Sequence, residues 1–302
     1  MTTPARALRG HRRGDRWFGM ALAAPALLVT LALLVYPLLS SFWVSLHDLR
    51  LSGGEPARFV GLRNYVEVVQ APLFWPSLWR TVLFALGVTV LTTAFGIGFA
   101  LVLDGDFWGR GLLRGLMILP WSLSQTTLAL TIGWIFNSTF GPLNGALFDL
   151  GLIDEYISWF ADGGTVLAVV GLGIVWSLTP FATLLFLGAL QTVPQEQLKA
   201  ARVDGAGAVR RFLLVVVPHI RETALIVVVL AALNGFLVFA PIYILTGGGP
   251  GTDTTMLAWW GYRTGFRDLN LGQSAAIFYI MTLLVMATAV ITVFALGRRR
   301  AT

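Results

Sequence analysis

Residues 196–222 read EQLKAARVDGAGAVRRFLLVVVPHIRE and form the longest polar interruption in the C-terminal half of an otherwise apolar chain. The first part favours a helix, and Ala200 and Ala201 leave a flat face that another protein can approach closely. Gly205 and Gly207 then interrupt the helix, at a cost of about 1 kcal/mol each relative to alanine. The stretch therefore predicts two short helices and a docking surface for another protein.

The ends of these two helices are predicted from single residues. Asp204 stands at the junction, directly before the first glycine, and Pro218 is expected to end the second helix because proline cannot continue one. Arg210, Arg211 and Arg221 carry positive charge that suits the lipid headgroups of the cytoplasmic face. The whole stretch is thus expected to lie at the membrane surface.

Composition places the chain in a membrane. Of its 302 residues, 56% are hydrophobic and only 12% are charged, whereas soluble domains carry about 25% charged residues. The mean hydropathy is strongly positive. There is no cysteine, which excludes disulfides, thiolate metal sites and cysteine nucleophiles.

Windows free of charge locate the membrane spans. An ionised residue at the centre of a membrane helix costs roughly 2.5–3.5 kcal/mol, and about 20 apolar residues cross the hydrocarbon. Six windows qualify: 17–46, 81–103, 115–148, 163–195, 223–252 and 269–297. The predicted fold class is all-α, a polytopic membrane protein with six transmembrane helices. Pro120 predicts a kink inside the third helix.

The basic residues predict the orientation. With the N-terminus in the cytoplasm, 15 Lys and Arg residues fall inside and 6 outside, and the loop 137–164 is acidic with no basic residue. Positive charge concentrates on the cytoplasmic side of membrane proteins. Both termini and the 196–222 loop are therefore expected in the cytoplasm. The net charge of +6 then reflects topology and the lipid bilayer, and no nucleic-acid partner is expected.

The spacing of Ala200-Ala201, Gly205 and Pro218 resembles the EAA coupling loop of the membrane subunits of bacterial ABC importers. In that family the loop lies in the cytoplasm and docks on the ATPase subunit. Lys199 departs from the pattern, because the family usually has Glu there. The resemblance implies these ATPase-coupling residues: Glu196, Lys199, Ala200, Ala201, Asp204, Gly205, Ala206 and Pro218.

Other segments resemble the carbohydrate-class permeases of the same family, those of the maltose, trehalose and glycerol-phosphate type. They are FVGLRNY at 59–65, GALQTVP at 188–194 and LTGGGP at 245–250. The resemblance covers about residues 25–296 and implies the type I ABC importer transmembrane fold. It divides the chain into a cytoplasmic tail (1–16), a first transmembrane helix (17–46) and a transmembrane domain (77–297) that includes the coupling loop.

Partners and localisation follow from the same resemblance. It implies a second, homologous permease subunit, two ATPase subunits and an extracellular or periplasmic solute-binding protein, in the bacterial cytoplasmic membrane. ATP and Mg are expected on the ATPase subunits, and no cofactor on this chain. The chain itself lacks a phosphate-binding loop, since that loop needs G-x-x-x-x-G-K-[ST] and Lys199 is the only lysine.

A solute path is expected to combine amides or hydroxyls with aromatic rings, because a sugar presents hydroxyls and an apolar ring face. Six residues within the spans meet this description: Gln125, Thr126, Thr179, Asn234, Phe239 and Tyr243. The alternative is that the amides only join helices, with about 0.6 kcal/mol per hydrogen bond.

No catalytic or metal site is expected. His11, His47 and His219 belong to different segments, and none forms a metal-binding pair such as H-x-x-x-H. The function expected from the sequence is therefore a non-enzymatic permease subunit of an ATP-driven importer for a sugar or sugar-like solute. The alternative is a stand-alone channel or secondary transporter for a small polar solute, although such proteins usually carry ionisable residues within their spans.

Overall fold

The chain is almost entirely helical in a computed structural model, which describes residues 8–52 and 56–297. Long helices are α1 (Leu8–Ser45), α3 (Phe74–Asp104), α7 (Gly163–Leu190), α10 (Val217–Phe236) and α13 (Leu271–Gly297). Shorter elements are α2 (Arg63–Gln70), α4 (Arg110–Trp121), α5 (Gln125–Ile135), α6 (Pro142–Asp149), α8 (Gln195–Val203), α9 (Ala208–Arg211), η1 (Phe212–Val216), α11 (Ala240–Leu245), α12 (Leu257–Tyr262) and η2 (Arg263–Arg267). The predicted all-α class is confirmed.

Five described helices are long and apolar enough to cross a membrane, and a sixth span exists if α4 and α5 count as one. These two helices meet at an angle of 96°, so the third predicted window contains a break after Trp121, and the kink predicted within one helix at Pro120 is wrong. The reason lies in Ser124, whose hydroxyl accepts a hydrogen bond from the backbone N–H of Thr127 at 3.1 Å and thereby starts α5 as a new helix.

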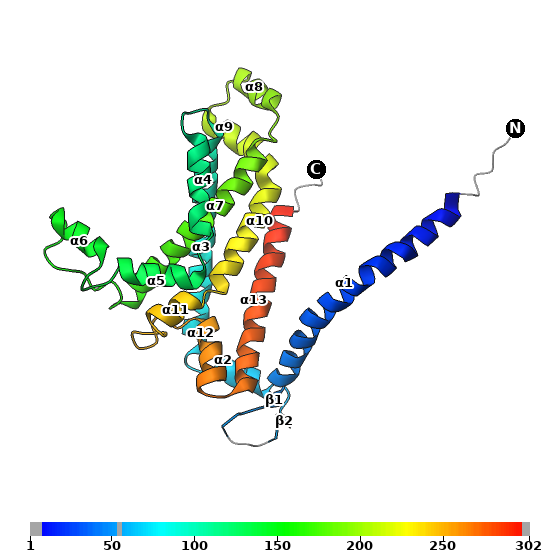
Figure 1. Cartoon of the computed structure of the whole chain (residues 1–302), viewed down its shortest axis with the longest axis vertical. Helices are drawn as coiled ribbons and strands as arrows, with labels where there is room; N and C mark the ends of the chain where they lie inside the picture. The colour runs from blue at the N-terminus through cyan, green and yellow to red at the C-terminus, as the bar shows by residue number, and fades with distance from the viewer. Residues whose placement is uncertain (1–7, 53–55, 298–302) are drawn as a thin grey trace.

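The core is a bundle of α3, α7 and α10, which run side by side along the long axis of the molecule (Figure 1). Small residues let these backbones approach. A Cβ added to Gly96 of α3 would lie 2.7 Å from the Cβ of Ala182 on α7. One added to Gly235 of α10 would lie 2.6 Å from the Cα of Ala85 on α3. Such close contacts drive association of helices in lipid, where the hydrophobic effect does not.

Helix α1 extends away from this bundle and returns to it only at its C-terminal end (Figure 1). There Phe42 packs edge-to-face on Tyr279 of α13, with 5.3 Å between ring centroids, and the Tyr279 hydroxyl donates to the carbonyl of Leu38. Ala21–Ser45 is the part of α1 that can span a membrane. The helix begins at Leu8, within the predicted tail, and residues 1–7 of that tail lie outside the described residues.

A short polar segment closes the end of the bundle where α1 meets α13. Strands β1 (His47–Asp48) and β2 (Arg58–Phe59) pair antiparallel, and Gly61 turns the chain with φ 59°. Buried Asn64 then donates to the carbonyls of Ser45 and His47 at 2.8 and 2.9 Å. The hydroxyl of Tyr65 shares a hydrogen bond of 2.7 Å with the hydroxyl of Ser45.

The fifth predicted window, 223–252, is divided in the structure. Helix α10 ends at Phe236 and α11 begins at Ala240, before the glycine run. A hydrogen bond closes the glycine run itself, since Thr254 donates its hydroxyl to the carbonyl of Gly249 at 2.7 Å. Gly248 has φ 92°, and a Cβ there would lie 2.3 Å from Nε1 of Trp259. The loop therefore depends on glycine at this position.

Candidate coupling surface and solute pocket

The predicted coupling surface lies on α8 and α9, which project together beyond one end of the bundle (Figure 1). Helix α8 stops at Val203 with Asp204 as its C-cap. The chain then reverses, because Gly205 has φ 75° and the N–H of Ala206 bonds to the carbonyl of Ala201 at 2.9 Å. This left-handed turn is a common way for a helix to end. The predicted junction at Asp204 and the short helix before it are confirmed, whereas the second helix is not short, because α9 continues through η1 into α10.

The coupling surface is open to solvent. No residue of α8 or α9 is buried. Among the predicted coupling residues, Ala201 and Ala206 are partly covered, and the others are exposed: Glu196, Lys199, Ala200, Asp204, Gly205 and Pro218. Two valines missed by the sequence analysis are also exposed, Val203 at 88% and Val209 at 72%. Their signal was present, since both are apolar residues in a polar loop outside the spans.

A hydrophobic cluster connects α8 and η1 to the membrane helices. Leu198 of α8 and Phe212 of η1 pack on a buried cluster that includes Leu103 of α3 and both Phe186 and Leu190 of α7. A displacement of α8 therefore acts directly on the ends of α3 and α7, because packed side chains transmit movement with little compression.

Pro218 was predicted to end the second helix, and this is wrong. It lies in the first turn of α10, and α9, η1 and α10 follow one another without a loop. In η1 the backbone N–H of Val217 bonds to the carbonyl of Phe212, five residues back. This wider turn shifts the backbone hydrogen bonds just before the proline away from the regular α-helical pattern. The N–H that proline lacks therefore interrupts no regular α-helical series.

Asn234 of α10 lies in a pocket of about 200 Å³ between α3, α4, α7 and α10. Its amide donates one hydrogen bond to the carbonyl of Leu230 at 2.9 Å. Thr92 of α3 lines the same pocket, and its buried hydroxyl has no hydrogen-bond partner among the described residues. This hydroxyl has almost no accessible surface, so the amide of Asn234 is the polar group that a solute in this pocket would meet.

An aromatic wall completes this pocket. The rings of Trp121 on α4 and Phe181 on α7 stack with 5.2 Å between centroids and 17° between planes, and both line the pocket. The sequence analysis did not select them as solute-path residues. The signal was that each aromatic residue directly follows a proline within a span, Pro120 or Pro180. We call this set of Thr92, Trp121, Phe181 and Asn234 the aromatic-amide pocket.

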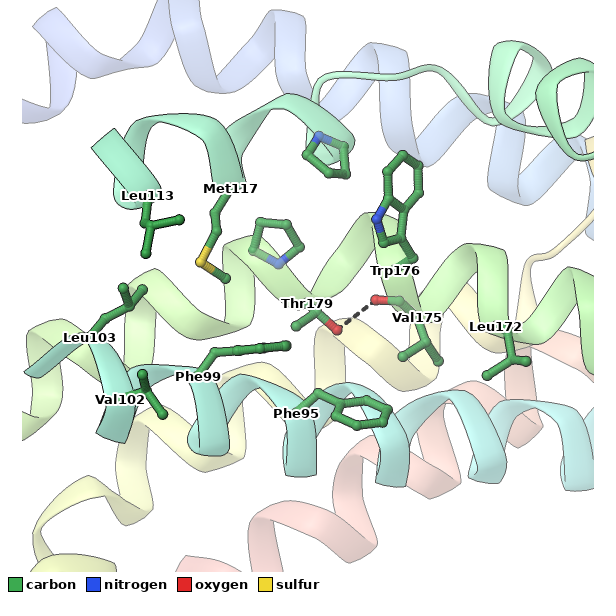
Figure 2. A pocket seen from close by; sticks show the side chains of 12 residues that line it. Phe95, Phe99, Val102, Leu103, Leu113, Met117, Leu172, Val175, Trp176 and Thr179 are labelled. Atoms are coloured by element: carbon green, nitrogen blue, oxygen red, sulfur yellow. Dashed lines mark hydrogen bonds between the residues drawn. The ribbon is translucent and has the colours of Figure 1, made fainter. Parts of the chain in front are cut away.

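The other predicted path residues lie elsewhere. Thr179 is buried and donates its hydroxyl to the carbonyl of Val175 at 2.6 Å. It lines a separate apolar groove of about 560 Å³ between α3, α4 and α7 (Figure 2). Gln125 and Thr126 occupy the first turn of α5, where Gln125 is partly buried and Thr126 is exposed. The structure thus does not bring the six residues into one site.

Phe239 and Tyr243 form a third group, on and just before α11. Their rings stack with 5.6 Å between centroids, and Tyr262 lies 4.9 Å from Phe239. Trp259 lies 5.5 Å from Tyr243, and the guanidinium of Arg267 lies 5.1 Å from the Trp259 ring. These aromatic rings partner one another, and Tyr243 alone of the predicted pair is exposed, at 42%.

Polar groups also gather at the end opposite the coupling surface. Arg63 and Gln273 both donate hydrogen bonds to the carboxylate of Glu67, at 2.6 and 2.8 Å. The hydrogen bond from Arg63, followed by that from Gln273, holds the pKa of Glu67 below its ordinary value. Helix α2 is thereby tied to α13. Among residues 8–52 and 56–297, no three His, Asp or Glu side chains could hold a metal ion.

Comparison with known proteins adds independent findings. Residues 92–301 match the model of the family described as binding-protein-dependent transport system inner membrane component. The permease protein SmoG of the sulfoquinovosyl glycerol transport system of Agrobacterium fabrum is 34% identical, over 92% of this chain and 90% of that protein. The permease protein MalF of the trehalose/maltose transport system of Thermococcus litoralis is also 34% identical, over 93% and 94%.

The fold also matches solved structures. A chain of a bacterial ABC transporter involved in the import of the acidic polysaccharide alginate superposes with a TM-score of 0.79 at 17% identity, covering 97% of this chain and 99% of that chain. The same transporter in complex with an alginate pentasaccharide-bound periplasmic protein gives a TM-score of 0.78 at 17% identity, covering 97% and 98%. At this identity the match describes the arrangement of helices.

Proposed function

The chain belongs to the family of binding-protein-dependent transport system inner membrane components, and from this membership we propose that it forms half of the translocation path of an ATP-driven importer for a sugar or sugar-like solute. It is a multi-pass protein of the inner membrane and a transport subunit, not an enzyme; the ATPase belongs to a partner. The observation that carries the proposal is the presence, in one chain, of an exposed coupling surface and an aromatic-amide pocket between its spans.

The solute class rests on chemistry and on relatives. Stacked Trp121 and Phe181 offer an apolar surface, while the amide of Asn234 offers hydrogen bonds. Sugars are recognised by this combination of ring faces and polar groups. Two relatives at 34% identity are named for the transport of sulfoquinovosyl glycerol and of trehalose or maltose. A glycoside of this kind is therefore the proposed solute.

The partners are assigned to the two ends of the molecule. Val203, Val209 and Ala200 on the coupling surface would contact the ATPase subunits, two per transporter, which would bind ATP and Mg. The end that carries β1, β2 and α2 would meet an external solute-binding protein. Both termini would then lie in the cytoplasm. The membrane-spanning window of α1 has no buried residue. Its exposed surface would pack against a second, homologous permease subunit.

Reconstitution tests this function. The chain, its companion permease, the ATPase and the purified binding protein would be placed in proteoliposomes, and uptake of radiolabelled trehalose and maltose would be followed. We expect uptake that requires ATP on the side of the membrane where the ATPase lies. Uptake should stop when the binding protein is omitted. Uptake of the same sugars by the chain without the ATPase would instead support a stand-alone channel or secondary transporter and would overturn the proposal.

A further inference from the structure

The apolar groove between α3, α4 and α7 is separate from the aromatic-amide pocket and has no role in the function proposed above. Its volume of about 560 Å³ lies within the range of sites that hold small ligands. In Figure 2 the side chains of Phe99, Met117 and Leu113 point into it from its two sides. Its walls run along the helices, as a hydrocarbon chain would in a bilayer.

One end of the groove carries a positive charge. Arg114 lies on α4 between the groove residues Leu113 and Met117, and its Nη2 donates to the carbonyl of Leu103 on the opposite wall at 2.7 Å. Arg114 forms no ion pair with the described residues, and its Nε is buried without a hydrogen-bond partner among them. Arg114 is only partly buried, so the remaining donors of its guanidinium, which have no partner among these residues, are open to an anion at the end of the groove.

The neighbouring charges do not neutralise Arg114. Asp106 is engaged by Arg110, in a contact on the solvent side of the α3–α4 loop. Asp104 is exposed at the end of α3. This loop lies at the same end of the molecule as α8 and α9 (Figure 1), and it presents Trp108 with 98% exposure. Exposed tryptophan is typical of the headgroup level of a membrane.

We propose that this groove binds an anionic phospholipid, with one acyl chain along the apolar walls and its phosphate on Arg114. Guanidinium groups bind phosphate through paired hydrogen bonds. The headgroup of phosphatidylglycerol has a phosphate and no ammonium group. In phosphatidylcholine the phosphate lies next to the ammonium group of the same headgroup, which already offsets its charge. Anionic lipids also gather in the cytoplasmic leaflet, where the positive-inside pattern places Arg114. The groove therefore selects phosphatidylglycerol over phosphatidylcholine.

The selectivity is tested on the assembled transporter in vesicles of phosphatidylcholine with one fifth phosphatidylglycerol. Spin-labelled forms of each lipid report the fraction immobilised on the protein. We expect Arg114→Gln to lower the preference for phosphatidylglycerol about five-fold, which corresponds to about 1 kcal/mol for one basic residue near the surface. Val102→Trp, at an exposed position of the groove wall, should displace both lipids from the site.

Two controls make the result decisive. Arg110→Gln removes a basic residue of the same end of the molecule that is already paired with Asp106, and it should leave the preference unchanged; an equal loss there would mean that general cytoplasmic charge, and not the groove, attracts the lipid. A photo-crosslinker at Val102 of the assembled complex should capture phosphatidylglycerol. Capture of the companion permease instead, or an unchanged preference in Arg114→Gln, would overturn the proposal.

Discussion

Gly235 of α10 lies directly against Ala85 of α3, so close that a Cβ on Gly235 would stand 2.6 Å from the Cα of Ala85. The two helices can approach to this extent only because one residue has no side chain and the other has a single methyl group. Gly96 of α3 makes an equally close contact with Ala182 of α7. The spacing of the three central helices thus depends on two glycines.

Replacement of Gly235 by alanine is expected to push α10 away from α3. Overpacking of a close contact costs about 1–3 kcal/mol, so the melting temperature of the purified complex should fall. Gly98→Ala is the matched control, because a Cβ at Gly98 of α3 meets nothing within 4 Å. Equal melting temperatures for the two variants would contradict the close contact.

The exposed Val203 is expected to be buried when the ATPase docks. Val203→Asp would place an unpaired charge in that interface, with a loss of about 2 kcal/mol or more, which is roughly 30-fold in affinity. Binding of the purified ATPase to the chain, measured in detergent without any solute-binding protein, should weaken accordingly. Val66→Asp, at an exposed valine of α2 on the opposite end, is the control for this measurement. A normal affinity of Val203→Asp for the ATPase would count against docking at this surface.

Gly205 is a less suitable place for this test. Its φ of 75° is strained for any residue with a side chain, and a Cβ there would meet nothing within 4 Å. We expect Gly205→Ala to loosen the α8–α9 turn even in the absence of the ATPase. Faster hydrogen exchange of the Ala206 amide, which bonds to Ala201, would report this. Exchange at the wild-type rate would mean that the turn tolerates a side chain.

The aromatic-amide pocket is expected to bind the solute. Asn234→Ala removes a hydrogen bond to it, and a net loss of about 0.5–1.5 kcal/mol should raise the half-saturating solute concentration by about three- to ten-fold. Assembly and melting temperature should change little. Gln125→Ala, in the first turn of α5, provides a comparison at a position outside the pocket. Loss of assembly in Asn234→Ala would favour a purely helix-joining role for the amide.

The acidic loop before α7 and the coupling surface are expected on opposite sides of the membrane. The chain has no cysteine, so Asp154→Cys and Ala208→Cys would each supply a single thiol. Both positions are exposed. A membrane-impermeant maleimide added outside cells should label the first variant and reach the second only after permeabilisation. Labelling of both from the same side would overturn the assigned topology.

The start of α7 is expected to loosen in acid. Asp162 accepts hydrogen bonds from the backbone N–H and the hydroxyl of Thr165, at 2.8 and 3.0 Å, and these hold its pKa below the ordinary value, the backbone bond most of all. Its stabilising effect is therefore complete above the pKa of the unfolded carboxyl and is lost as the pH falls through the lower folded value. Exchange of the Thr165 amide should rise over that interval in the wild type, after correction for intrinsic rates. It should not do so in Asp162→Asn, whose amide caps without titrating.

Residue type and order alone determined the class of this protein and most of its elements. Long charge-free windows can be stable only as helices in lipid, because each backbone N–H and C=O must then bond within its own segment. The break after α8 was also predictable, because Gly205 and Gly207 lie close together in a polar stretch, where no packing against other helices offsets the cost of glycine in a helix. These features depend on neighbours in the sequence and on the surrounding solvent.

Contacts between distant residues decided the rest. Pro218 looked like a helix end, yet the π turn before it allows the chain to continue into α10. The predicted path residues lie in four separate places, because which face of α7 or α10 meets another helix depends on where small residues such as Gly96 and Gly235 permit close approach. Trp121 and Phe181 lie 60 residues apart, and only the packing of α4 on α7 makes them one surface. The sequence therefore determined which segments cross the membrane, and tertiary packing decided which side chains share a site.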